Sequence, residues 1–185
     1  MITETIKDIT LSFNAASSLF SPDRVDKGTL AMLSVVNFEP GDRVLDLGCG
    51  YGVVGILAAK LIGAENVVMT DIDKKALRYA RENANREGVG GVKIIESDGF
   101  RGLDEKDFTL ILSNPPYHAD FSVPKHFIEK GFNRLKIGGR LYMVTKRRDW
   151  YRNKLIAIFG GVTVSEIDGY FVFCAEKRKE RYGKG

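Results

Sequence analysis

The chain has 185 residues, of which 44% are hydrophobic and 28% are charged, and its formal net charge is +4. This composition is typical of a folded globular protein and excludes an intrinsically disordered chain. Residues 1–10 lack the apolar core of a signal peptide, and no stretch is apolar enough for a membrane helix. The two cysteines, Cys49 and Cys174, form no Cys-x-x-Cys pair, so we expect neither disulfides nor a metal site. A cytoplasmic protein without a membrane partner is expected.

Positive charge is concentrated in the last part of the chain. Residues 136–185 contain 12 Lys and Arg against 5 Asp and Glu, whereas residues 1–135 contain 16 against 19. Clustered cations attract a polyanion and gain free energy from the release of its counterions. A solvated surface with a charged tail explains the same distribution equally well, so charge alone leaves a nucleic-acid partner open.

The predicted elements begin with a short extension, which holds a possible strand at residues 9–13, a loop, and a helix after Asp26. From residue 42 onward, short β-branched runs alternate with helical stretches. Strands are predicted at residues 42–47, 66–70, 92–96, 108–113 and 140–145, and helices at 53–60, 73–87, 126–136 and 149–159. Such alternation predicts an α/β fold with a mostly parallel sheet that is covered by helices on both faces.

Three local signals refine this pattern. Asp73 is expected to cap the second helix of the alternating region, and the glycines in residues 137–139 are expected to end the third. Two last strand-like runs, at residues 162–167 and 170–177, are joined by Asp168-Gly169. This spacing predicts a hairpin, which would add an antiparallel strand at that end of the sheet.

The segment VLDLGCGYGVVG, after the first strand of the alternating region, is the most informative motif. Gly48, Gly50 and Gly52 let the backbone approach a ligand without an intervening side chain, and Cys49 suits the turn because it is small. A dinucleotide fingerprint needs its first glycine directly after the strand, which is not the spacing here. Asp46, at the strand end, suits a cation better than a diphosphate. The motif therefore favours S-adenosylmethionine, which carries an ammonium and a sulfonium, over a ligand-free turn.

Acidic residues also follow the next two strands. Ligands collect at the carboxyl ends of parallel strands. There, Asp71 can accept hydrogen bonds from ribose hydroxyls, and Asp98 can meet the adenine amino group while Phe100 offers an apolar face. Ile72 and Gly99 adjoin these acids and complete the expected cofactor contacts.

The fourth strand runs into the sequence SNPPYH. Two consecutive prolines cannot continue a central strand, so this segment is predicted to be a stiff loop. An exocyclic amine is a poor nucleophile because its lone pair is delocalised into the ring. The Asn114 side-chain oxygen and the Pro115 carbonyl can accept its two N–H bonds and stabilise the positive charge that develops on nitrogen. Tyr117, after Pro116, can stack on the base, a contact worth about 1–3 kcal/mol. A rigid turn capped by Asn114, without catalysis, is the alternative.

Together these motifs resemble the class I S-adenosylmethionine-dependent methyltransferases that carry an Asn-Pro-Pro-aromatic motif. More narrowly, roughly residues 10–176 resemble the small-domain methyltransferases that make N2-methylguanosine in small-subunit (16S) ribosomal RNA. The segment LFSPDRVDKGTL, residues 19–30, is similar to their Phe-Ser and Asp-x-Gly-Thr signature. The resemblance implies a Rossmann-like, seven-stranded, mostly parallel sheet whose last strand is antiparallel.

The resemblance also implies the reaction and its partners. We expect direct in-line methylation of guanine N2 with S-adenosylmethionine as the donor, without a covalent enzyme intermediate or a metal. The partner is RNA, either ribosomal RNA or a ribosomal subunit, and the protein is a monomer or a homodimer. Residues 1–40 would pack on a methyltransferase domain at 41–176, with a basic tail at 177–185. The cofactor contacts include Asn114, and the expected substrate contacts are Phe20, Ser21, His118, Lys146, Arg147 and Arg148.

Several alternatives stay open at this point. Adenine-N6 methylation poses the same chemical problem, because Asn114 cannot distinguish one amino group from another. Protein-glutamine methyltransferases share the Asn-Pro-Pro-Tyr motif, but they resemble one another in a helical N-terminal domain for which the 40-residue extension is too short. A non-catalytic RNA-binding module with a vestigial cofactor site is a third possibility, and the intact acidic and glycine positions argue against it.

Overall fold

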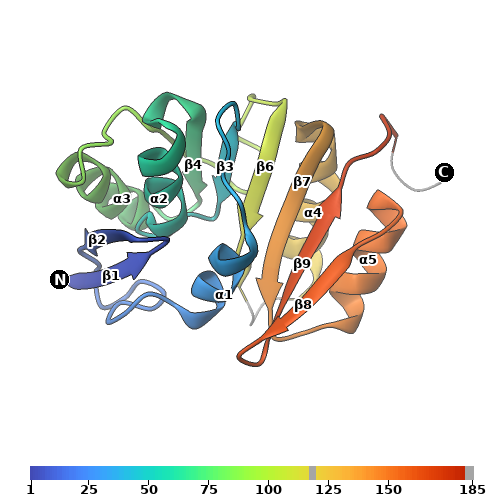
Figure 1. The fold of residues 1–185 in the computed structure, drawn as a ribbon, viewed down its shortest axis with the longest axis horizontal. Coiled ribbons are helices and arrows are strands. Elements are labelled where there is room, and N and C mark those ends of the chain that lie inside the picture. Colours follow the sequence, from blue (N-terminus) through green and yellow to red (C-terminus); the bar gives the residue numbers. More distant parts are fainter. Residues whose placement is uncertain (117–119, 182–185) are drawn as a thin grey trace.

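The computed structural model describes residues 1–116 and 120–181. Its centre is one seven-stranded sheet. In spatial order, the strands are β5 (Lys93–Glu96), β4 (Val67–Asp71), β3 (Val44–Leu47), β6 (Phe108–Ser113), β7 (Leu135–Thr145), β9 (Tyr170–Glu176) and β8 (Thr163–Ile167) (Figure 1). The first five are mutually parallel, and β9 is antiparallel to both of its neighbours. The Rossmann-like sheet with an antiparallel last strand is thereby confirmed.

Helices cover both faces of the sheet. On one face lie α1 (Lys27–Val35), α2 (Val53–Ile62) and α3 (Lys74–Arg86), and on the other lie α4 (Ser122–Arg134) and α5 (Asp149–Phe159). A short 3-10 helix, η1 (Ala64–Asn66), leads from α2 into β4. In Figure 1, α1 lies in front of the sheet and α4 behind it. The alternation of side chains along each strand divides the apolar residues into two clusters, one under each helical layer.

The helix and hairpin signals behave as predicted. The Asp73 carboxylate accepts a hydrogen bond from the Lys75 N–H at the start of α3, with 2.9 Å between the nitrogen and the oxygen. Asp168 and Gly169 both have positive φ, 51° and 80°, and join β8 to β9 in a two-residue hairpin. A tight connection of this kind follows the right-handed twist of the two strands.

Two boundaries differ from the predictions, and both shifts have a physical reason. Helix α4 begins at Ser122 rather than at residue 126, because Pro124 lies in the first turn, where a missing N–H costs nothing. The glycines of residues 137–139 do not end this helix but lie inside β7. The Gly138 N–H donates to the Lys177 carbonyl and the Lys177 N–H donates to the Gly139 carbonyl, so long-range pairing recruits this segment into the sheet.

Lys177, assigned to the basic tail from the sequence, is instead part of the folded protein. Its side chain is only 5% exposed, and its ammonium group donates to the Leu135 carbonyl, at 2.9 Å between nitrogen and oxygen. The nitrogen also lies 4.8 Å from the centre of the Phe132 ring. The chain therefore stays folded through residue 177. Within the described ranges, no helix is long and apolar enough to cross a membrane.

The extension before β3 forms an additional hairpin that the sequence only half predicted. The predicted strand at residues 9–13 is present as β2 (Ile9–Phe13), and it pairs with β1 (Ile2–Ile6), which was missed. Both strands contribute side chains to the same apolar cluster as α2 and α3. The predicted helix after Asp26 is α1.

Asn83 on α3 fastens this extension to the rest of the fold. Its side chain is fully buried and accepts a hydrogen bond from the Asn14 N–H (2.8 Å). The same carboxamide donates to the Asn14 carbonyl (3.0 Å) and to the Tyr51 carbonyl (2.8 Å). One amide therefore holds the chain after β2 and the turn after β3 against α3.

We expect the substitution Asn83→Ala to lower the free energy of unfolding by about 3 kcal/mol, because it leaves buried backbone groups without partners. Asn85→Ala, the same change at an exposed position of the same helix, is the control and should change stability by less than about 0.5 kcal/mol. Denaturant titration of both variants measures the difference. Equal stability of the two would contradict this role of Asn83.

Candidate active site

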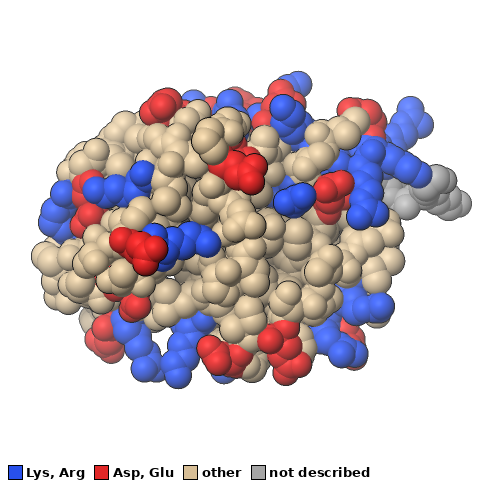
Figure 2. All heavy atoms as spheres, viewed as in Figure 1, with Lys and Arg blue, Asp and Glu red and all other residues tan. Residues whose placement is uncertain are grey.

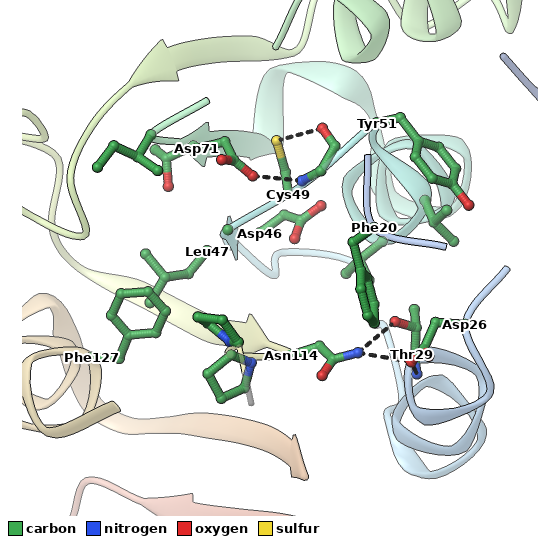
Figure 3. Close-up of a pocket in the computed structure, with 18 of the residues that line it drawn as sticks. Phe20, Asp26, Thr29, Asp46, Leu47, Cys49, Tyr51, Asp71, Asn114 and Phe127 are labelled. Carbon is green, nitrogen blue, oxygen red and sulfur yellow. Dashed lines mark hydrogen bonds between the residues drawn. The ribbon is translucent and has the colours of Figure 1, made fainter. Parts of the chain in front are cut away.

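The carboxyl ends of β3, β4, β5 and β6 surround a cavity of about 420 Å³ (Figure 3). The N-terminus of α1 and the loop before it close its other side. This is the edge of a parallel sheet at which ligands bind, and the volume is that of a site for a small molecule. Most of the residues predicted from the sequence line it: Phe20, Ser21, Asp46, Gly48, Cys49, Gly50, Asp71, Ile72, Asp98, Gly99, Asn114, Pro115 and Pro116.

The turn between β3 and α2 presents backbone to the cavity. Gly48 and Gly50 have φ of 74° and 57°, and a Cβ atom added at either position would meet no atom within 4 Å. Gly52 has a different part, because it does not line the cavity. It starts α2 at a φ of 109°, and a Cβ atom there would lie 2.9 Å from the Ile56 Cδ1 atom. The turn therefore needs all three glycines, but only two of them leave room for a ligand.

Asp46 is a buried carboxylate at the wall of the cavity. Its side chain is 3% exposed, and one oxygen accepts a hydrogen bond from the Gly55 N–H at 2.8 Å. Burial raises the pKa of Asp46 to about 7, since water no longer stabilises its charge. A positively charged ligand beside it would restore the preference for the charged form.

Asp71 ties the end of β4 to the glycine turn. One of its oxygens accepts from the Gly50 N–H (2.8 Å) and the other from the Asp73 N–H (3.0 Å). Burial is the main cause that raises the pKa of Asp71. Each carboxylate oxygen has a second lone pair, so Asp71 can still accept hydrogen bonds from a ligand.

Asn114 is held by two residues at the start of α1. Its side-chain nitrogen donates to Asp26 Oδ2 at 2.9 Å and to Thr29 Oγ1 at 3.2 Å. A carboxylate can only accept, so the amino end of the carboxamide must face Asp26, and the oxygen points away from α1 (Figure 3). The sequence analysis placed Asn114 in the site but missed Asp26 and Thr29 as its partners. The Asp-x-Gly-Thr spacing was the signal that could have identified them.

Phe20 lies over the cavity on a loop that the glycine turn anchors. Its side chain is 59% exposed, while the next residue, Ser21, has a φ of 51°. The Tyr51 hydroxyl donates to the carbonyls of Ser21 (3.0 Å) and Arg24 (3.3 Å), which fixes this loop. Burial raises the pKa of Tyr51 to about 12, so its hydroxyl keeps its proton. Tyr51 was not predicted as a site residue, although it lies inside the glycine motif.

Phe100 is the clearest correction to the predicted site. Its ring is buried in the core, 3% exposed, and the Arg134 guanidinium lies 5.4 Å from its centre. Its N–H donates to Nε2 of His126 at 3.0 Å, so the loop after β5 is pinned to α4. The apolar side chains that do line this part of the cavity come from Leu47 and Phe127. Phe100 therefore supports the loop and does not face the ligand site.

Lys146, Arg147 and Arg148 follow β7 as predicted, but they point in different directions and none lines the cavity. The Lys146 nitrogen lies 5.1 Å from the centre of the Tyr170 ring. The Arg147 guanidinium lies 5.2 Å from the centre of the Phe121 ring, and Arg148 pairs with the neighbouring Asp149. They are exposed cations at the rim, available to a large anionic partner.

The basic C-terminal region does not form one surface. Lys136 and Arg140 lie at the start of β7, and Lys146 lies just beyond its end. Because β9 is antiparallel to β7, residues 177–181 lie beside the start of β7, on the opposite edge of the sheet from the cavity. Figure 2 shows basic side chains at this edge, near the C-terminus. Only the cations that follow β7 lie near the candidate site.

Two predicted residues, Tyr117 and His118, lie outside the described residues. Among the residues that are described, no group of three or more His, Cys, Asp or Glu side chains could hold a metal ion.

The chain is similar to curated proteins of two kinds. It is 33% identical over 177 residues to protein YbxB of Bacillus subtilis, covering 92% of this chain and 87% of YbxB. It is 29% identical to ribosomal RNA small subunit methyltransferase C of Pseudoalteromonas atlantica and to ribosomal RNA large subunit methyltransferase G of Klebsiella pneumoniae. These matches cover 93% and 89% of this chain, which spans only 51% and 46% of the two methyltransferases.

Comparison with solved structures and with families agrees with this. The fold superposes with a TM-score of 0.86 on the Thermus thermophilus 16S rRNA N2 G1207 methyltransferase RsmC, whose structure is a complex with AdoMet and guanosine. The identity is 26%, over 95% of this chain and 50% of that one. A family model described as methyltransferase small domain matches residues 10–174. The chain therefore belongs to the methyltransferase small domain family of S-adenosylmethionine-dependent methyltransferases.

Proposed function

We propose that this protein methylates an exocyclic amino nitrogen of a base in ribosomal RNA, with guanine N2 in the small-subunit RNA as the target. The observation that carries the proposal is the oriented carboxamide of Asn114, which shares one cavity with the glycine turn after β3. The turn provides a place for a methyl donor, and the amide provides an acceptor for an amine.

The donor side of the cavity fits S-adenosylmethionine. When bound, this compound supplies a methyl group on a positively charged sulfur, which an amine can displace in line with loss of one proton. The open backbone at Gly48 and Gly50 leaves room for it, and the buried Asp46 carboxylate suits its positive charge. Asp71 can accept hydrogen bonds from the ribose hydroxyls. Ile72, whose side chain is 64% exposed, offers an apolar contact for the adenine.

The acceptor side suits an amine attached to an aromatic ring. The Asn114 oxygen and the Pro115 carbonyl would accept the two N–H bonds of the amine, so that its lone pair turns toward the donor. They would also stabilise the positive charge that forms on nitrogen. Phe20, exposed over the cavity, offers a face on which a base can stack.

The choice of guanine N2 in small-subunit RNA draws support from two relatives: methyltransferase C, and the RsmC structure that contains guanosine. The similarity to large subunit methyltransferase G makes a large-subunit RNA the second candidate. Nothing in the cavity distinguishes guanine N2 from adenine N6, so the base has to be identified by experiment.

The direct test is methyl transfer from labelled S-adenosylmethionine to purified 16S RNA, 23S RNA and both ribosomal subunits, followed by mass mapping of the nucleosides. One N2-methylguanosine in 16S RNA or in the small subunit is expected. The label in large-subunit RNA, in N6-methyladenosine or in protein would replace the proposed substrate. No transfer to any RNA, with intact cofactor binding, would refute it.

Asn114→Ala should lower kcat about 100-fold or more, since it removes an acceptor that acts on charge developing in the transition state. The Kd for S-adenosylmethionine should change by less than about threefold, because most donor contacts come from other residues. Asn153→Ala, at an exposed position of α5, is the control and should behave as wild type. Rapid turnover by the Asn114 variant would disprove its assigned role.

The pKa of about 7 for Asp46 predicts a pH-dependent affinity. Below pH 7 the free protein carries a neutral Asp46 and must lose a proton to hold a cation, so the affinity falls as the pH falls. The amino group of the ligand itself titrates near pH 8, so the comparison is made with Asp46→Asn, which keeps the acceptor for the Gly55 N–H. By calorimetry, the ratio of wild-type to variant affinity should rise about tenfold between pH 6 and pH 8. A constant ratio would show that Asp46 does not sense the ligand.

Replacing Lys146, Arg147 and Arg148 together by Gln should weaken RNA binding and reduce the slope of log K against log salt by about 2. The matched control replaces Lys136, Lys179 and Arg181, which lie at the opposite edge of the sheet, by Gln. It makes the same change in net charge. If RNA contacts the rim beside the cavity, only the first set changes the slope, whereas equal effects would mean that total charge drives binding.

A further inference from the structure

The start of α1 forms a link between the N-terminal extension and the proposed amine-binding loop. Asp26 Oδ2 accepts two hydrogen bonds, one from the Thr29 N–H at 3.0 Å and one from the Asn114 amino group at 2.9 Å. Thr29 Oγ1 accepts from the same amino group at 3.2 Å. Asp26 and Thr29 both line the cavity. One carboxylate oxygen thus caps a helix and contacts a side chain 88 residues away in the chain.

Helix capping alone does not account for this arrangement. A serine or an asparagine caps a helix as well as an aspartate does. Neither of them, however, combines a negative charge with a group that can only accept hydrogen bonds. Thr29 is the residue whose N–H is capped, yet its hydroxyl also reaches Asn114.

Gly28, between them, is required by close packing. A Cβ atom at this position would lie 2.8 Å from the Tyr170 ring and 2.9 Å from Asp26 Oδ2. Only glycine therefore lets the start of α1 lie this close to β9 while Asp26 keeps its place. The segment Asp26–Thr29 has a geometric reason at each of the positions that the Asp-x-Gly-Thr signature specifies.

We infer that Asp26 and Thr29 are positioning residues for methyl transfer, acting through Asn114. This inference rests on the proposed function. A carboxamide has nearly the same shape when it is rotated by 180°, and the rotated form would present N–H groups to an amine that needs an acceptor. The Asp26 carboxylate excludes the rotated form, because it would then face the amide oxygen.

The charge of Asp26 has a second effect on the same amide. A carboxylate that accepts from the amino end of a carboxamide polarises it and increases the negative charge on its oxygen. That oxygen is the atom proposed to face the amine, on which positive charge develops during transfer. Thr29 supports the geometry but cannot enforce it, since a hydroxyl can donate as well as accept.

The test compares variants that keep the helix cap. Asp26→Ser keeps the cap but no longer reaches Asn114, and Asp26→Asn keeps the shape but loses both the charge and the exclusive acceptor. We expect kcat to fall at least tenfold in both, with the Kd for S-adenosylmethionine and the Tm close to wild type. Thr29→Ser should retain wild-type kcat, and Thr29→Val should lose severalfold. Asp73→Ser changes the cap of α3 in the same way and should leave kcat unchanged.

A readout independent of turnover separates this inference from the proposed function. The NMR signals of the Asn114 side-chain amino group, assigned by their loss in Asn114→Ala, should shift in Asp26→Ser and Asp26→Asn but not in Asp73→Ser. Shifted signals without methylation of any RNA would refute the proposed function and leave the positioning intact. Unchanged Asn114 signals, or full kcat in both Asp26 variants, would overturn the inference. Should Asp26→Ser fail to fold, Thr29→Val against Thr29→Ser provides the same comparison.

Discussion

The left-handed turn between β3 and α2 is the constraint on which the rest of the site depends. It reverses the chain within a few residues, which only glycines at positive φ allow, and α2 then packs directly on the strand it has left. The same reversal aims backbone N–H groups at two acids: Gly55 at Asp46 and Gly50 at Asp71. These bonds satisfy carboxylates that would otherwise be costly to bury. The turn therefore forms the wall of the cavity and also keeps acidic groups there.

The N-terminal extension completes the cavity rather than merely lying beside it. The Asn83 amide holds the chain after β2 against the glycine turn, and the Tyr51 hydroxyl holds the loop that carries Phe20. A short loop later, α1 presents Asp26 to Asn114. Donor-side and acceptor-side residues thus share one hydrogen-bonded framework, although they come from segments far apart in the chain. Movement of the extension would disturb both sides of the site together.

The direction of β9 decides how charge is distributed around this framework. A final strand parallel to β7 would carry residues 177–181 toward the cavity, whereas the antiparallel strand carries them to the other edge. The basic surplus of the C-terminal region is therefore divided between two ends of the molecule. Cations near the cavity are few and diverge from one another, a pattern suited to separate phosphates along a chain rather than to one compact anion.

Local sequence was sufficient for much of the fold and for the donor side of the site. The alternation of strands and helices, the Asp73 cap and the Asp168-Gly169 hairpin depend on neighbouring residues, so they were readable without a structure. The acids at strand ends could be grouped because parallel strands end at one edge of a sheet. Tertiary structure decided the remainder. Phe100 is apolar either way, and only packing shows that its ring enters the core. The link from Asp26 to Asn114 joins residues 88 positions apart, a contact that no local pattern specifies because the intervening fold brings the two together.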